Sequence, residues 1–122
     1  MIQNSIKLDF GSKKLEFFFG MSFLGEFLEE EKTDVKEIYA NIKRNPYGYV
    51  PDLMYRSHLH NCKRKKEDPN LKPFEMADLI ESSGHFKEGS ESLKFIEVFM
   101  QSILDGFPEP EPETKKSNSK KK

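Results

Sequence analysis

Three residues of types that often bind metals or act in catalysis, His58, His60 and Cys62, lie close together in the sequence. On a helix, residues 58 and 62 share a face, whereas residue 60 points elsewhere. A tetrahedral metal site needs four ligands, and the only other histidine, His85, has no supportive spacing. The pattern therefore predicts a histidine at the core edge, a histidine at the surface and a buried thiol.

Cys62 is followed by Lys63 and Arg64, cations that can lower the pKa of a neighbouring thiol. A nucleophile also needs a base and an orienting group, and the sequence shows neither assembled with this cysteine. The glycines are isolated and form no phosphate-binding loop. We therefore expect no cofactor, no metal and no enzymatic activity. The alternative is a small enzyme whose pocket holds convergent polar groups with shifted pKa values.

Lys63–Lys66 is the longest unbroken run of basic residues in the chain. It could contact phosphates, which makes a nucleic-acid-binding regulator the first alternative function. Such binding would be strongly salt-dependent and would be lost when the four residues are replaced by glutamine. However, the formal net charge of the chain is −1, and cations are also favourable at a helix C-terminus. We therefore regard nucleic acid as an unlikely partner.

Aromatic residues are the candidates for a partner-binding surface. The segment Pro46-Tyr47-Gly48-Tyr49 is expected to be a loop that exposes two tyrosines, and Tyr55 follows on the next helix. Exposed tyrosines often anchor protein–protein contacts. Tyr47, Tyr49 and Tyr55 are therefore candidate partner-binding residues. An equal alternative is that the tyrosines of the loop fold back over the central helix.

The order of the elements that position these residues indicates an α+β fold. Alternating apolar residues around a Gly11-Ser12 turn predict a β-hairpin over residues 5–19. Residues 20–106 show about five helical patterns, packed as a bundle against the hairpin. Their expected boundaries are Met21 to near Lys32, Asp34 to Asn45, a central helix with Pro51 near its first turn, Pro73 to Ser83, and Ser90 to Gly106.

Length and composition predict the domain organisation and the cellular compartment of the protein. The chain has 122 residues, of which 35% are hydrophobic and 34% charged, and its eleven phenylalanines predict a core built on that residue. We expect one globular domain over residues 1–106 and a disordered Pro/Glu then Lys-rich tail over residues 107–122. A single cysteine favours a reducing cytosol. Neither a secretory signal nor a membrane span is expected.

Two segments carry a resemblance to a known family. The hairpin leading into FGMSFLGEFLEE, followed by PYGYVPDLMYRSHLHNCKRKK, resembles tail assembly chaperones of long-tailed (siphovirus-type) bacteriophages of Gram-positive hosts. The resemblance covers most of residues 5–105. It consists of the order of elements, the Phe-Gly-Met helix start, the acidic run and the Val-Pro-Asp-Leu-Met-Tyr helix. It contains no residue motif that marks a binding surface.

The resemblance implies a non-enzymatic protein that acts in the host cytoplasm and is absent from the mature virion. Such chaperones coat the long helical tape measure protein, keep it soluble and give way as tail tube protein polymerises round it. Many are also made in a longer, frameshifted form that is thought to recruit the tube protein. A slippery run of codons could encode Lys120–Lys122. Repeated weak contacts along the partner, and self-association into a ring or spiral, are further expectations.

Overall fold

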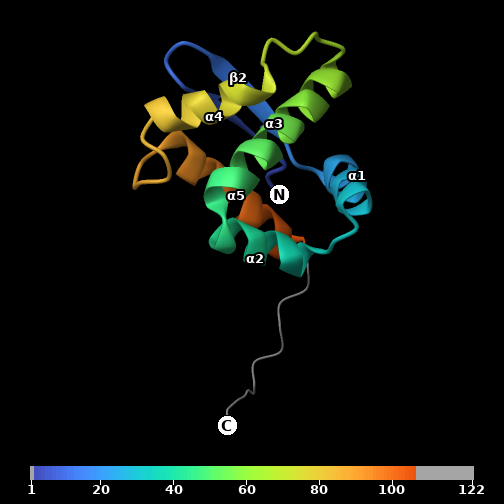
Figure 1. The fold of residues 1–122 in the computed structure, drawn as a ribbon. Coiled ribbons are helices and arrows are strands. Elements are labelled where there is room, and N and C mark those ends of the chain that lie inside the picture. Colours follow the sequence, from blue (N-terminus) through green and yellow to red (C-terminus); the bar gives the residue numbers. More distant parts are fainter. Residues whose placement is uncertain (1, 107–122) are drawn as a thin grey trace.

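The structure of the protein is a computed structural model that describes residues 2–106 (Figure 1). Over this part, an N-terminal hairpin is followed by five helices, which confirms the predicted α+β fold. The tail predicted for residues 107–122 lies outside the described residues. The elements are β1 (Ser5–Asp9), β2 (Lys14–Phe18), α1 (Met21–Glu31), α2 (Val35–Arg44), α3 (Pro46–Lys65), α4 (Pro73–Ser82) and α5 (Glu91–Asp105).

The hairpin is an antiparallel pair in which Leu8 lies opposite Leu15. Its turn contains Gly11 at φ +91°, a left-handed conformation that glycine adopts without steric cost. Helix α3 crosses one side of the hairpin, with α4 and α1 flanking it and α5 lying behind (Figure 1). A two-stranded sheet is marginal alone in water, so the helices that cover it supply most of its stability.

Aromatic rings from the hairpin and α5 form the centre of the core. Phe95 packs edge-to-face against Phe17 and Phe19, with ring centroids 5.4 and 5.8 Å apart, and it stacks on Phe99 at 5.7 Å. All four rings are fully or almost fully buried. The expectation of a phenylalanine-based core is confirmed, and these rings join the N-terminal hairpin to α5.

Two buried polar side chains of α3 bind the outer edge of β2. Ser57 donates its hydroxyl hydrogen to the carbonyl oxygen of Phe18 at 2.8 Å, and Nδ1 of His58 donates to the carbonyl oxygen of Glu16 at 2.8 Å. An unpaired strand edge would leave these carbonyl groups buried without partners. The two side chains therefore satisfy the strand and set its position along α3.

Replacing Ser57 by alanine should lower the free energy of unfolding by about 1–3 kcal/mol, because the buried Phe18 carbonyl would lose its partner. Chemical denaturation would measure the change. Ser82→Ala is the matched control, since the hydroxyl of the exposed Ser82 bonds only to a carbonyl of its own helix. Equal effects of the two substitutions would contradict the role assigned to Ser57.

Most predicted helix ends are confirmed. The carboxylate of Asp34 accepts a hydrogen bond from the Glu37 amide at 2.9 Å, and the hydroxyl of Ser90 accepts one from the Leu93 amide at 3.3 Å. Helix α1 ends at Glu31, followed by Lys32 in the left-handed region. In each of these caps, the donor and the acceptor belong to residues a few positions apart, so the local sequence is enough to predict the helix end.

The loop predicted for Pro46-Tyr47-Gly48-Tyr49 is wrong, because these residues form the first turn of α3. Asn45, with φ −149° and ψ 72°, avoids the helical region, as the residue before a proline should, and its side chain accepts a hydrogen bond from the Gly48 amide at 3.2 Å. Asn45 thus ends α2 and caps α3, with Pro46 in the first helical position. Pro51 accordingly lies inside the helix and not near its first turn.

Candidate protein-binding groove

The histidines and the cysteine of α3 do not meet at one point. The Cys62 thiol lies 3.4 Å from Nε2 of His58, whose other ring nitrogen binds β2, while His60 lies on the side facing α1. Burial raises the pKa of the buried Cys62 thiol, which disfavours the reactive thiolate. Among residues 2–106, no three His, Cys, Asp or Glu side chains are placed to hold a metal ion.

His60 is more enclosed than a surface histidine, which corrects its predicted position. Its side chain is 10% exposed and lies stacked on Phe18 with the edge of Phe23 nearby. The Ser22 hydroxyl shares a hydrogen bond of 2.9 Å with Nε2. Glu26 lies 3.7 Å from Nδ1, beyond hydrogen-bond distance. The contacts of Ser22 and Phe23 with His60 hold α1 against α3.

Burial lowers the pKa of His60 below its ordinary value of 6.5, against the opposing effect of Glu26. The unfolded chain therefore binds more protons than the folded chain in this range. The stability contributed by neutral His60 should be present above about pH 6.5 and should be lost as the pH falls through the folded pKa. Denaturation between pH 7.5 and pH 5 would measure the slope. His60→Gln should flatten it and Glu26→Gln should steepen it, whereas identical slopes would contradict this assignment.

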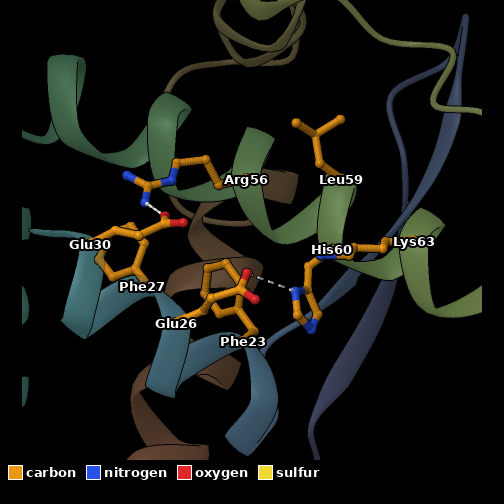
Figure 2. Close-up of a pocket in the computed structure, with 8 residues that line it drawn as sticks. All are labelled: Phe23, Glu26, Phe27, Glu30, Arg56, Leu59, His60 and Lys63. Atoms are coloured by element: carbon orange, nitrogen blue, oxygen red, sulfur yellow. Dashed lines mark hydrogen bonds and ion pairs between the residues drawn. The ribbon is translucent and has the colours of Figure 1, made fainter.

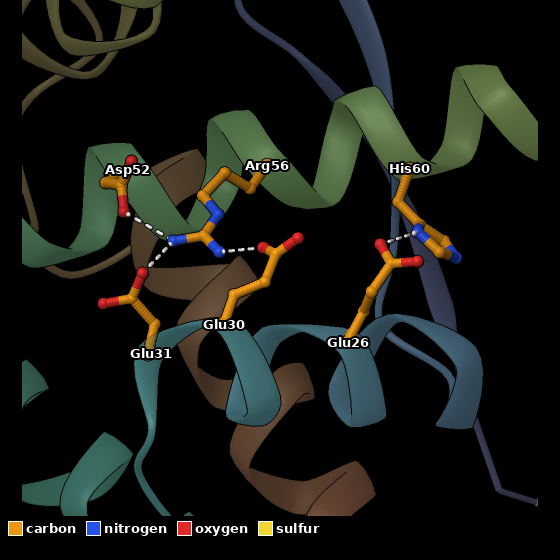
Figure 3. Close-up of polar contacts among 6 residues, drawn as sticks. All are labelled: Glu26, Glu30, Glu31, Asp52, Arg56 and His60. Carbon is orange, nitrogen blue, oxygen red and sulfur yellow. Dashed lines mark hydrogen bonds and ion pairs between the residues drawn. The ribbon is translucent and has the colours of Figure 1, made fainter.

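The cleft between α1 and α3 encloses about 190 Å3. Figure 2 shows rings from α1 facing Arg56 and His60 from α3. Arg56 binds carboxylates of Glu30 and Glu31 at 2.6 Å each and approaches Asp52 at 3.4 Å (Figure 3). Its guanidinium lies 4.4 Å from the ring centre of Phe27. These charged side chains already bind one another across the cleft. The contacts therefore hold α1 against α3 and leave these groups less available to a ligand.

The basic run at the end of α3 is partly used within the molecule. The guanidinium of Arg64 lies 4.1 Å from the ring centre of Phe18, and Lys65 forms an ion pair with Glu16. Lys63 lines the cleft to α1, and Lys66 follows the helix in the left-handed region. Two of the four cations thus have internal contacts, and no observation here favours the nucleic-acid alternative.

The three candidate tyrosines of α3 have different surroundings. Tyr47 is 68% exposed and contacts His85 and Phe86 in the segment after α4. Tyr49 turns towards Phe27 of α1, and Tyr55 is half-buried against the core. Burial raises the pKa of the Tyr49 phenol, whose hydroxyl makes no hydrogen bond of good geometry within the described residues. The tyrosines therefore do not form one continuous surface.

An apolar groove that sequence reasoning missed lies between α1, the start of α2 and the end of α5. It encloses about 460 Å3, and its lining is predominantly apolar. The lining side chains come from segments distant in the sequence, so no local pattern reveals the groove. Its apolar lining consists of Ile2, Phe19, Met21, Leu24, Leu28, Val35 and Ile103, with glycines at positions 20, 25 and 106.

Several side chains at or near this groove are open to solvent. Met21 is 89% exposed and Ile2 is 48% exposed, and both line the groove. Leu104, 59% exposed, follows the lining residue Ile103. Grouped exposed apolar side chains mark protein–protein contact sites more often than scattered ones. This groove is therefore the strongest candidate for a functional surface in the described part of the chain.

A second exposed aromatic, Phe74, stands apart on α4 and is 84% exposed. It lines neither the groove nor the cleft beside Arg56. Phe74 therefore provides a comparison for Met21, because both are large, exposed apolar residues near the start of a helix.

None of the helices within residues 2–106 combines the length and the apolar character needed to cross a bilayer. Comparison of the chain with protein-family models, with curated proteins and with solved structures found no match.

Proposed function

We propose that this chain is a tail assembly chaperone of a long-tailed bacteriophage. It binds the tape measure protein, keeps it soluble in the host cytoplasm, and is released as tail tube protein polymerises, so it is absent from the mature virion. The proposal is supported by the resemblance over residues 5–105 and by the order of hairpin and helices, which matches the expected fold.

The single observation that carries the proposal is the open apolar groove beside α1. A chaperone for a long amphipathic helix must cover apolar side chains that would otherwise aggregate, and a groove with exposed Met21 provides such cover. Methionine suits this task because its flexible side chain adapts to different partners. The contact of one groove with the client is expected to be weak. Many copies bound along one client therefore give avidity and still allow displacement. Self-association of neighbouring copies would extend the coat.

A longer form of the protein is part of the proposal. A ribosomal frameshift near the codons for Lys120–Lys122 would append a segment that recruits tail tube protein, with residues 107–122 as the connection. The nucleotide sequence tests this directly. We expect a slippery A-rich run and an overlapping downstream frame, and the absence of either would remove the longer form from the proposal.

Co-expression tests the main proposal. The full chain would be produced together with the large helical protein encoded just downstream, followed by affinity purification at moderate salt. We expect the partner to become soluble and to elute with several copies of this chain. If the partner stays insoluble while this chain elutes alone, this chain is not a sufficient chaperone.

A further inference from the structure

Gly25 is the one helical glycine for which the described fold supplies no steric reason. A Cβ atom at Gly20 would lie 2.5 Å from the Phe18 ring, and one at Gly48 would lie 2.8 Å from the Asn45 side chain. At Gly25, nothing lies within 4 Å of the Cβ position. Glycine in a helix interior destabilises the helix relative to alanine, so this residue weakens α1 without improving its packing.

Gly25 lies on the wall of the apolar groove, one helical turn after Met21. The missing side chain leaves the groove open at the middle of α1. Small residues at such positions let a second backbone approach closely, as they do where two helices cross. A larger residue at position 25 would project into the space that a partner would occupy.

The shape of an occupant follows from the backbone around the groove. The Phe19 amide already donates to the Asn4 carbonyl at 2.8 Å, so this pair is not available to an added strand. An extended peptide lying across the side chains of α1 and α5 would find no backbone partners there, because the amide and carbonyl groups inside a helix bond within that helix. A helix satisfies its backbone internally and can present an apolar stripe to the wall.

The negative charge beside the groove indicates which charged residues should flank the apolar stripe of a bound helix. A neighbouring depression shares Gln3 and Ser102 with the groove and is also lined by Glu97 and Asp105. Within residues 2–106, no lysine or arginine lines either surface. A partner with basic residues beside its apolar stripe would complement these carboxylates, whereas an acidic flank would be repelled.

We infer that this groove binds an amphipathic helix that crosses α1 at Gly25 and places Lys or Arg residues towards Glu97 and Asp105. The inference rests on the proposed function, since it specifies which kind of tape measure segment is held. It assigns the groove to a partner helix and not to a second copy of this chain.

Two synthetic peptides and one substitution test the inference on the full chain. Both peptides are helical and 20 residues long with the same leucine stripe, and the flanking residues are lysine in one and glutamate in the other. We expect the lysine peptide to bind at least about tenfold more tightly at low salt. Gly25→Gln should weaken its binding at least about tenfold, while Tm stays equal or rises because glutamine is the better helix former.

Ala77→Gln is the matched control, because Ala77 is a small exposed residue inside α4. It should leave peptide binding unchanged. Equal binding by the wild-type and Gly25→Gln chains would overturn the inference, as would preference for the glutamate peptide. A concentration-dependent dimer that Gly25→Gln dissociates would assign the groove to a second copy. Tighter peptide binding after Phe107→Ser would assign it to the chain's own following segment.

The inference and the proposed function fail in distinguishable ways. If Gly25→Gln abolishes peptide binding but the wild-type chain never solubilises the tape measure protein, the groove is a helix site and the proposed client is wrong. If both chains solubilise that client equally, the chaperone proposal stands and the groove is not where the client binds.

Discussion

Aspartate in place of Met21 is expected to reduce the soluble yield of co-expressed tape measure protein at least about tenfold. Met21 is 89% exposed on the groove, so the change places a charge where an apolar client side chain would pack. Loss of a central apolar contact costs about 2 kcal/mol or more, which exceeds the 1.4 kcal/mol that corresponds to a factor of ten. The assay compares tape measure protein in the soluble and pelleted fractions.

The fold itself should tolerate this substitution. Met21 begins α1, and an acidic residue in the first turn interacts favourably with the helix dipole. Phe74→Asp is the matched control, because Phe74 is 84% exposed and lies in the first turn of α4. It should leave client solubility unchanged. If Phe74→Asp removes the client from solution and Met21→Asp does not, the binding surface lies on α4 and not in the groove.

Truncating Phe95 to alanine should lower the free energy of unfolding by about 3–5 kcal/mol, the largest effect on stability that we expect. The ring is completely buried and contacts phenylalanines from both the hairpin and α5. Its removal would leave a cavity where the hairpin meets α5. Denaturation in urea, monitored by circular dichroism, would measure the loss.

The same truncation at an exposed position supplies the comparison. Phe74→Ala should change the free energy of unfolding by no more than about 0.5 kcal/mol, because its ring is largely in water in the native state. A loss below about 1.5 kcal/mol for Phe95→Ala would mean that the aromatic cluster is not the centre of the core. A loss larger than the expected range of about 3–5 kcal/mol would indicate that the hairpin detaches when the ring is removed.

Local signals predicted most of the fold. The alternation at Leu8 and Leu15 identified the hairpin, and the caps at Asp34 and Ser90 located two helix starts. Each of these features is made by residues a few positions apart, so the sequence contains both partners. The loop wrongly predicted at Tyr47-Gly48-Tyr49 also concerns residues that are close together in the sequence. The proline–glycine composition suggested a loop, but the Asn45 cap and Pro46 begin a helix there.

Features made by distant segments could not be predicted in the same way. At the end of α1, Glu30 and Glu31 bind Arg56, which lies some 25 positions away, so no local pattern shows this contact. The groove has the same origin, because residues near positions 2, 21 and 103 meet only after folding. Composition indicated the apolar residues but not which of them would remain open to solvent.

For the candidate tyrosines, residue type predicted exposure at Tyr47 but did not predict whether the three side chains share one surface. Aromatic residues near a turn are frequent binding anchors, and Tyr47 is indeed exposed. However, Tyr49, two residues after Tyr47, faces α1, and Tyr55 is half-buried against the core. Gly25 is a different local feature: a glycine inside an amphipathic pattern weakens a helix, and the described fold supplies no packing reason for it.

Hydrogen–deuterium exchange of the full chain, with and without the co-purified tape measure protein, tests most directly whether the groove holds the client. We expect slower exchange in α1 (Met21–Glu31) and at the end of α5 in the complex, with exchange in α4 unchanged. Protection confined to α4 or to the basic run Lys63–Lys66, with α1 unaffected, would contradict binding in the groove.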